Sequence, residues 1–156
     1  MKTKLFMSLA TIAILATLLV ATPARAENTR IYFTGNEPGC DEWVVSRVVE
    51  SGPNLHLRIY SQTCHDEASI PQFTGTNYAY NGILNFVGGG ELVTITGKFH
   101  FVSVEGGIWD GNFTFHANAN TLIGVGHGEG LYEGQDIHIT TNISTGNFWG
   151  YIDTHE

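Results

Sequence analysis

The chain has 156 residues, of which 42% are hydrophobic, so it is long enough for one domain with a sizeable core. It carries 7 lysine and arginine residues against 15 aspartate and glutamate residues, a formal net charge of −8. Such an acidic protein repels nucleic acid and anionic membranes, which excludes both as expected partners.

The first 26 residues have the pattern of a secretory signal peptide. Met1–Lys4 is basic, Leu5–Ala21 is apolar, and residues 24–26 form the A-x-A sequence that a signal peptidase requires. An uncleaved anchor is the alternative, because the apolar run approaches the ~20 residues that span a bilayer. Cleavage would leave a single secreted or periplasmic domain, Glu27–Glu156, without a stable membrane anchor. Its net charge would be −11, because 4 basic residues then face 15 acidic ones.

Cys40 and Cys64 are the only cysteines in the sequence, and both fall in the predicted exported part. In an oxidising compartment such a pair is expected to form one disulfide, worth about 3 kcal/mol of stability. A metal site or redox couple is the less favoured alternative, because the spacing is not C-x-x-C.

Short β-rich runs alternate with turn signals, the pattern of an all-β sandwich or barrel. In the N-terminal part the predicted strands are 30–34, 42–50, 55–61 and 77–87, with a turn at 35–39 and an irregular segment at 64–76.

The C-terminal half is predicted to be an antiparallel meander, because three-residue connections join its strands. Its predicted strands are Leu92–Val104, Ile108–Ala117, Thr121–Leu131 and Gln135–Ser144, with Phe148–Ile152 as a fifth candidate. Alternation along the first two places five aromatic residues on one face, which we expect to line or fill the interior: Phe99, Phe101, Trp109, Phe113 and Phe115.

The third of these strands has glycine at every second position from Gly124 to Gly130. His127 and Glu129 lie among the aliphatic residues in between. If both adjacent hairpins are symmetric about their turns, His127 and Glu129 point inward, near Trp109. A bulge or a one-residue slip would turn them outward.

Four histidines, one on each of four successive strands, invite a metal-site interpretation: His100, His116, His127 and His138. However, the predicted facing of His127 is opposite to that of the other three. We therefore predict no metal and no cofactor.

The pattern Gly124-Val-Gly-His-Gly-Glu-Gly-Leu-Tyr-Glu-Gly134 follows a strand rich in Trp and Phe. Over Thr94–Ile152 the chain resembles small β-barrels of the allene oxide cyclase and dirigent type. The resemblance implies a calycin-like barrel of about eight antiparallel strands that holds an apolar ligand in its lumen. Some such barrels guide cyclisation or radical coupling, but their other polar lumen residues have no match in residues 30–81. Activity therefore does not carry over.

Three functions remain open from the sequence. The first is binding of a small, largely apolar ligand without a reaction, with Trp109, Phe99, Phe113, His127 and Glu129 as the ligand-binding candidates. The second is a cyclase or isomerase in which His127 and Glu129 are the catalytic acid and base. The third is a structural or interaction protein with a filled core that could form homo-oligomers. The absence of a hydrolase motif makes an enzyme the less favoured class.

Overall fold

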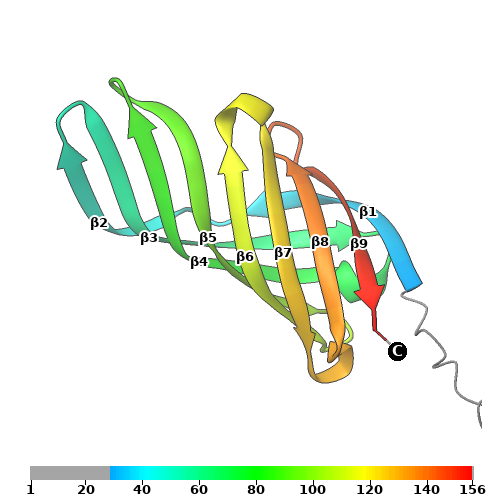
Figure 1. Cartoon of the computed structure of the whole chain (residues 1–156). Coiled ribbons are helices and arrows are strands. Elements are labelled where there is room, and N and C mark those ends of the chain that lie inside the picture. The colour runs from blue at the N-terminus through cyan, green and yellow to red at the C-terminus, as the bar shows by residue number, and fades with distance from the viewer. Residues whose placement is uncertain (1–28, 156) are drawn as a thin grey trace, which may run out of the picture.

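The computed structural model describes residues 29–155, and the predicted signal peptide at 1–26 lies outside these described residues. The described part forms nine antiparallel strands and three short 3-10 helices (Figure 1). No helix within it is long and apolar enough to cross a membrane. The elements in chain order are β1 (Thr29–Cys40), β2 (Val44–Ser51), β3 (Asn54–Ala68), η1 (Pro71–Phe73), β4 (Gly75–Val87), β5 (Glu91–Ser103), β6 (Ile108–His116), η2 (Ala117–Ala119), β7 (Thr121–Glu129), η3 (Gly130–Tyr132), β8 (Gln135–Asn142) and β9 (Asn147–Thr154).

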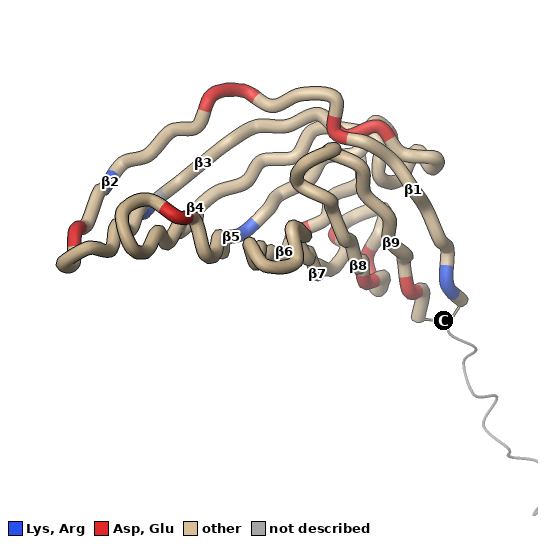
Figure 2. The backbone as a smooth tube through the Cα atoms, turned by 90° about the horizontal axis from the view of Figure 1, so that it is seen from above, with Lys and Arg blue, Asp and Glu red and all other residues tan. Residues whose placement is uncertain are grey.

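The sheet closes into a barrel because β1 has two partners. One is β9, and the other is the second half of β3, which β1 meets between Gly35↔Ala68 and Cys40↔Cys64. The first half of β3 pairs instead with β2, which extends the sheet outside the ring. Figure 2 shows the strands arching from β2 round to β1. The predicted small antiparallel barrel with one disulfide is confirmed, with nine strands rather than about eight.

The predicted C-terminal meander is also confirmed, since β5 to β9 are neighbours in chain order. The N-terminal predictions were less accurate, because β1 and β3 are both longer than expected. The predicted turn at 35–39 lies inside β1, where the pairing shifts between Asn36 and Gly39. An irregularity in a strand accommodates glycine and proline, and β3 supplies the backbone partner that the local sequence does not reveal.

The interior is filled by aromatic rings that lie on bare glycine backbone. Phe99 on β5 is opposite Gly111 on β6, which pairs in turn with Gly126 on β7. An added Cβ at Gly111 or Gly126 would approach the Phe99 ring to 2.5 and 2.8 Å respectively. Gly150 on β9 leaves room for Phe33 in the same way. An eight-stranded barrel has room for these aromatic side chains only if the strand positions beneath them are glycines.

This packing corrects the predicted facing of β7. The glycines point inward, whereas His127 and Glu129 are exposed on the outer face. His127 pairs with Asp110 rather than Gly111, and with Asp136 rather than Ile139. These shifts of one and three residues are both odd, and an odd shift moves every side chain to the other face of a strand. They arise because the turns are centred elsewhere than expected: the β6–β7 connection, which contains η2, has four residues, 117–120, and η3 follows β7 directly.

The short helices η1 and η3 each send one ring into the core. Phe73 of η1 stacks on Phe101 at 4.4 Å, and Tyr132 of η3 stacks on Trp109 at 4.8 Å between ring centroids. The Trp109 indole N–H donates to the carbonyl of Gln72 at 3.0 Å. Each buried ring with a polar group therefore has its partner, and the core cluster is continuous across the barrel.

Two neighbouring glycines of β7 provide a test of this packing. A Cβ at Gly126 would lie 2.6 Å from the Asp110 carbonyl oxygen, whereas a Cβ at Gly124 would have its nearest neighbour at an ordinary 3.6 Å. We expect Gly126→Ala to lower the free energy of unfolding by about 1–3 kcal/mol, as overpacking does. Gly124→Ala should leave it unchanged or raise it by up to about 1 kcal/mol. Urea denaturation measures both, and equal effects would contradict the proposed role of the glycine face.

Candidate functional site

A small cavity of about 60 Å³ lies in the interior beside the Phe99 ring. Its walls are mainly apolar and come from β4 to β9 and from η1, whereas its polar groups are Glu37 of β1, Asp66 of β3, Asn77 of β4 and Thr141 of β8. Rings that line it include Phe99, Phe113 and Phe148.

The polar side of this cavity contains two carboxyl groups and an amide. Asp66 on β3 is only 4% exposed, and its one side-chain hydrogen bond is a long one, donated by Asn77 Nδ2 to Oδ2 at 3.4 Å. Asn77 Oδ1 is buried without a hydrogen-bond partner. Glu37 on β1 is half-buried beside them. Because buried polar groups are normally satisfied, this arrangement has capacity to receive a donor.

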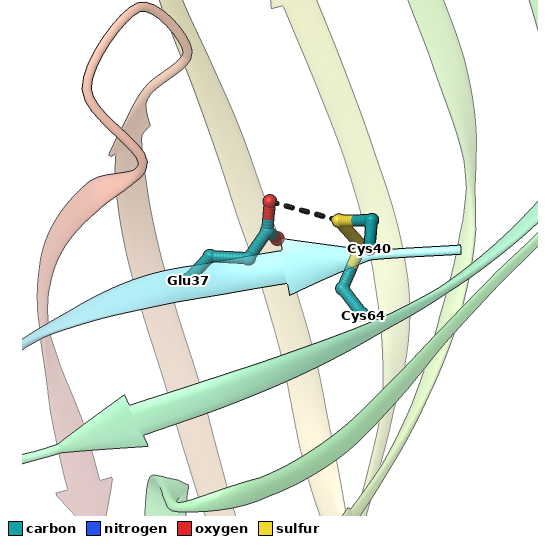
Figure 3. Close-up of side chains that lie close together, drawn as sticks. All are labelled: Glu37, Cys40 and Cys64. Atoms are coloured by element: carbon teal, nitrogen blue, oxygen red, sulfur yellow. Dashed lines mark hydrogen bonds between the residues drawn. A yellow bond between two sulfur atoms is a disulfide. The ribbon is translucent and has the colours of Figure 1, made fainter. Parts of the chain in front are cut away.

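The disulfide holds these groups in place. Cys40 and Cys64 are directly opposite each other in the β1–β3 pairing, and Asp66 faces the same side of β3 as Cys64 because it lies two residues further along. Glu37 lies in the irregular part of β1, and its Oε1 is 3.1 Å from Sγ of Cys40 (Figure 3). A disulfide sulfur has no proton to donate, so this contact is a hydrogen bond only when the Glu37 carboxyl is protonated.

The environment raises the pKa of each acid. Burial, and then the negative charge of Glu37, raise the pKa of Asp66 from 3.8 to about 7, although the Asn77 hydrogen bond opposes this. Burial also raises the pKa of Glu37. Tyr60 of β3 has its pKa raised to about 12 by burial and by the charge of Glu37. A carboxyl group with a pKa near neutrality can donate or accept a proton at physiological pH, which is typical of functional sites.

Of the ligand-binding residues predicted from the sequence, some line the cavity and others do not. Phe99 and Phe113 line the cavity, as expected of interior aromatics. Trp109 is fully buried but packs on Tyr132, outside the cavity lining. His127 and Glu129 are on the outer face of β7 and do not belong to the lumen site.

The predicted difference in facing among the four histidines was also wrong. The side chain of His127 points outward like those of the other three. The four histidines are nevertheless not in one row across the sheet, because their strands pair in a different register. His100 and His127 both pair with Asp110, whereas His138 pairs with Val125 and His116 with Thr121. Nδ1 of His100 is 3.0 Å from Oδ1 of Asp110.

A metal site needs several ligand atoms close together. Within residues 29–155, the one group of three or more His, Cys, Asp or Glu residues whose ligand atoms lie within 4.8 Å of one another is Glu37, Cys40 and Cys64. The two sulfurs are bonded to each other, so neither is the thiolate that binds metals. The oxidised protein therefore has no metal site at this group.

Sequence reasoning did not find Glu37 and Asp66, because they fall in the predicted turn and in the segment thought irregular. One signal was present. Given the disulfide, Cys64, Asp66 and Ala68 alternate with His65 and Glu67, a pattern that predicts a strand with Asp66 on the side of the bridge.

Neither models of protein families, nor curated proteins, nor solved structures give a match to this chain. The resemblance to the allene oxide cyclase and dirigent barrels therefore stays a prediction. Function must therefore be inferred from the residues and geometry of the site.

The raised pKa of Asp66 predicts a specific pH dependence of stability. Between about pH 4 and pH 7 the folded protein holds a proton that the unfolded chain has released, so this contribution is complete below pH 4 and is lost as the pH rises through the folded pKa. Asp66→Asn cannot lose that proton. We expect the variant to gain stability relative to the unmodified protein between about pH 4 and pH 8, on the order of a few kcal/mol.

Calorimetric unfolding at both pH values measures this difference. Glu67→Gln is the matched control, because Glu67 is exposed on the outer face next to Asp66 and should show no such change. If the two variants followed the same pH profile, the raised pKa of Asp66 would be wrong.

Proposed function

We propose that this protein is an exported β-barrel that binds one small molecule in its lumen cavity. The observation that carries the proposal is a cavity with apolar walls and an unsatisfied polar side, inside a barrel that is otherwise tightly packed. Binding sites typically combine an apolar surface with a few converging polar groups. The proposed export agrees with the Cys40–Cys64 disulfide, since such bonds persist in oxidising compartments.

The cavity limits the size of the ligand. Its volume of about 60 Å³ is less than half that of the ~150 Å³ cavities that hold benzene, and far below the ~300 Å³ at which drug-sized sites begin. A drug-sized apolar ligand does not fit this space. The proposed ligand has a few non-hydrogen atoms, an apolar body against Phe99 and Phe113, and one polar group directed at Asp66 and Asn77.

The cyclase or isomerase alternative assigned the acid–base roles to His127 and Glu129. Both residues are exposed on the outer face, so neither can act in the lumen. Acid–base chemistry in the cavity would instead have to use Asp66 and Glu37. Binding without a reaction is the better supported proposal, because the small apolar cavity with a few polar groups accounts for it directly.

Propan-2-ol is a suitable neutral probe, because it has four non-hydrogen atoms and one hydroxyl. Such a ligand gains at most about 6 kcal/mol, so the Kd should not be tighter than tens of micromolar, and the titration belongs in the millimolar range. We expect saturable NMR shifts of the amides of Ala79, Leu122 and Gly124, which line the cavity.

A variant that fills the cavity tests whether the shifts report on this site. Ala79→Val places two extra carbons in the cavity and should weaken binding several-fold. Ala119→Val, the same change at an exposed turn, should leave it unchanged. The proposal is wrong if shifts at these amides do not saturate, or if both variants bind alike.

A further inference from the structure

We propose that the ligand of this cavity is a small organic amine, bound as its ammonium cation between the Asp66 carboxylate and the aromatic wall. This inference rests on the proposed function and specifies its ligand class. It starts from a charge imbalance: two carboxyl groups reach the cavity, but none of the described residues that line it is basic.

The rest of the described chain does not supply the missing positive charge. Arg30 pairs with Asp153 at 2.8 Å and lies over the Tyr151 ring at 4.5 Å, on the outer face. The described ion pairs otherwise join His100 to Asp110 and His155 to Asp136, also away from the cavity. Among residues 29–155, no ion pair includes Asp66 or Glu37. A buried carboxylate without a cation is costly, and an ammonium group would remove that cost.

The hydrogen-bonding groups match the same ligand. An ammonium group has three donors and no acceptor. Asp66 accepts only one long hydrogen bond from the protein, and Asn77 Oδ1 accepts none. These oxygens offer acceptors to a donor-only group. A neutral alcohol could satisfy only one of them with its single proton.

The opposite walls also favour a cation with an apolar body. Rings of Phe73, Phe99, Phe113 and Phe148 line the cavity. Aromatic rings attract a desolvated cation that lies over them, and the alkyl part of the ligand buries its surface against the same rings. An anion would meet both carboxyl groups, so the site disfavours it.

Three titratable groups face the ligand position or one another, namely Glu37 from β1 and Asp66 and Tyr60 from β3. The described lining residues from β4 to β9 and η1 are not titratable. The bound ammonium favours the ionised form of Asp66, so binding near pH 6.5 should release protons, and affinity should rise between about pH 5 and pH 8. Tyr60 stays neutral over this range, because its pKa is raised to about 12.

The test compares propan-2-amine with propan-2-ol, which have the same shape and differ in charge. At pH 8 and 0.15 M salt we expect the amine to bind at least ~10-fold more tightly, equivalent to about 1.4 kcal/mol. Calorimetry in two buffers of different ionisation enthalpy should detect proton release near pH 6.5 for the amine only. Asp66→Asn should abolish both the advantage and the proton release, and Glu37→Gln should reduce the advantage.

Glu67→Gln removes one negative charge from the outer face and should preserve the selectivity, which controls for general attraction to an acidic protein. If the alcohol binds at the cavity amides and the amine binds no more tightly, the amine assignment is overturned while the proposed function stands. If neither ligand binds there, both fail. An advantage that survives both Asp66→Asn and Glu37→Gln places the amine elsewhere and also overturns the inference.

Discussion

The contact between aromatic rings and bare glycine backbone is the constraint on which this barrel depends. The Phe99 ring occupies the space that side chains at Gly111 and Gly126 would need, and Gly97 makes room for Phe113 in the same way. Because each ring lies over neighbouring strands, those strands must carry glycines in the matching rows. Gly126 and Gly128 of β7 are therefore required by the packing, whereas Gly124 leaves room for a methyl group, and His127 and Glu129 are directed to solvent.

The same constraint determines where a ligand can be. A barrel of eight strands filled with large aromatic side chains leaves little free volume. The remaining cavity lies between these side chains and polar groups of β1, β3 and β4. Neither Glu37 nor Asp66 belongs to a sequence motif. They are brought together only when β1 closes the sheet on β3, so the site is a product of barrel closure rather than of any one segment.

The fold was predictable from the sequence to a greater extent than the site. Strict alternation and short turns were enough to predict the meander from β5 to β9 and the inward facing of Phe99 and Trp109. Local pattern could not reveal the length of β1 and β3, because their pairing depends on residues far apart in the chain. The facing of His127 was wrong for a related reason: a period of two gives two sets of side chains, and only the turn geometry decides which set is inside.

The bond between Cys40 and Cys64 has a consequence for the acidity of the lumen. It joins the two strands that carry Glu37 and Asp66 close to those positions, so two groups that repel each other when ionised cannot move apart to relieve the repulsion. Burial is the first cause of the raised pKa of each acid, and the charge of Glu37 adds to it at Asp66. The covalent link keeps the two strands together, and with them the distance over which that charge acts.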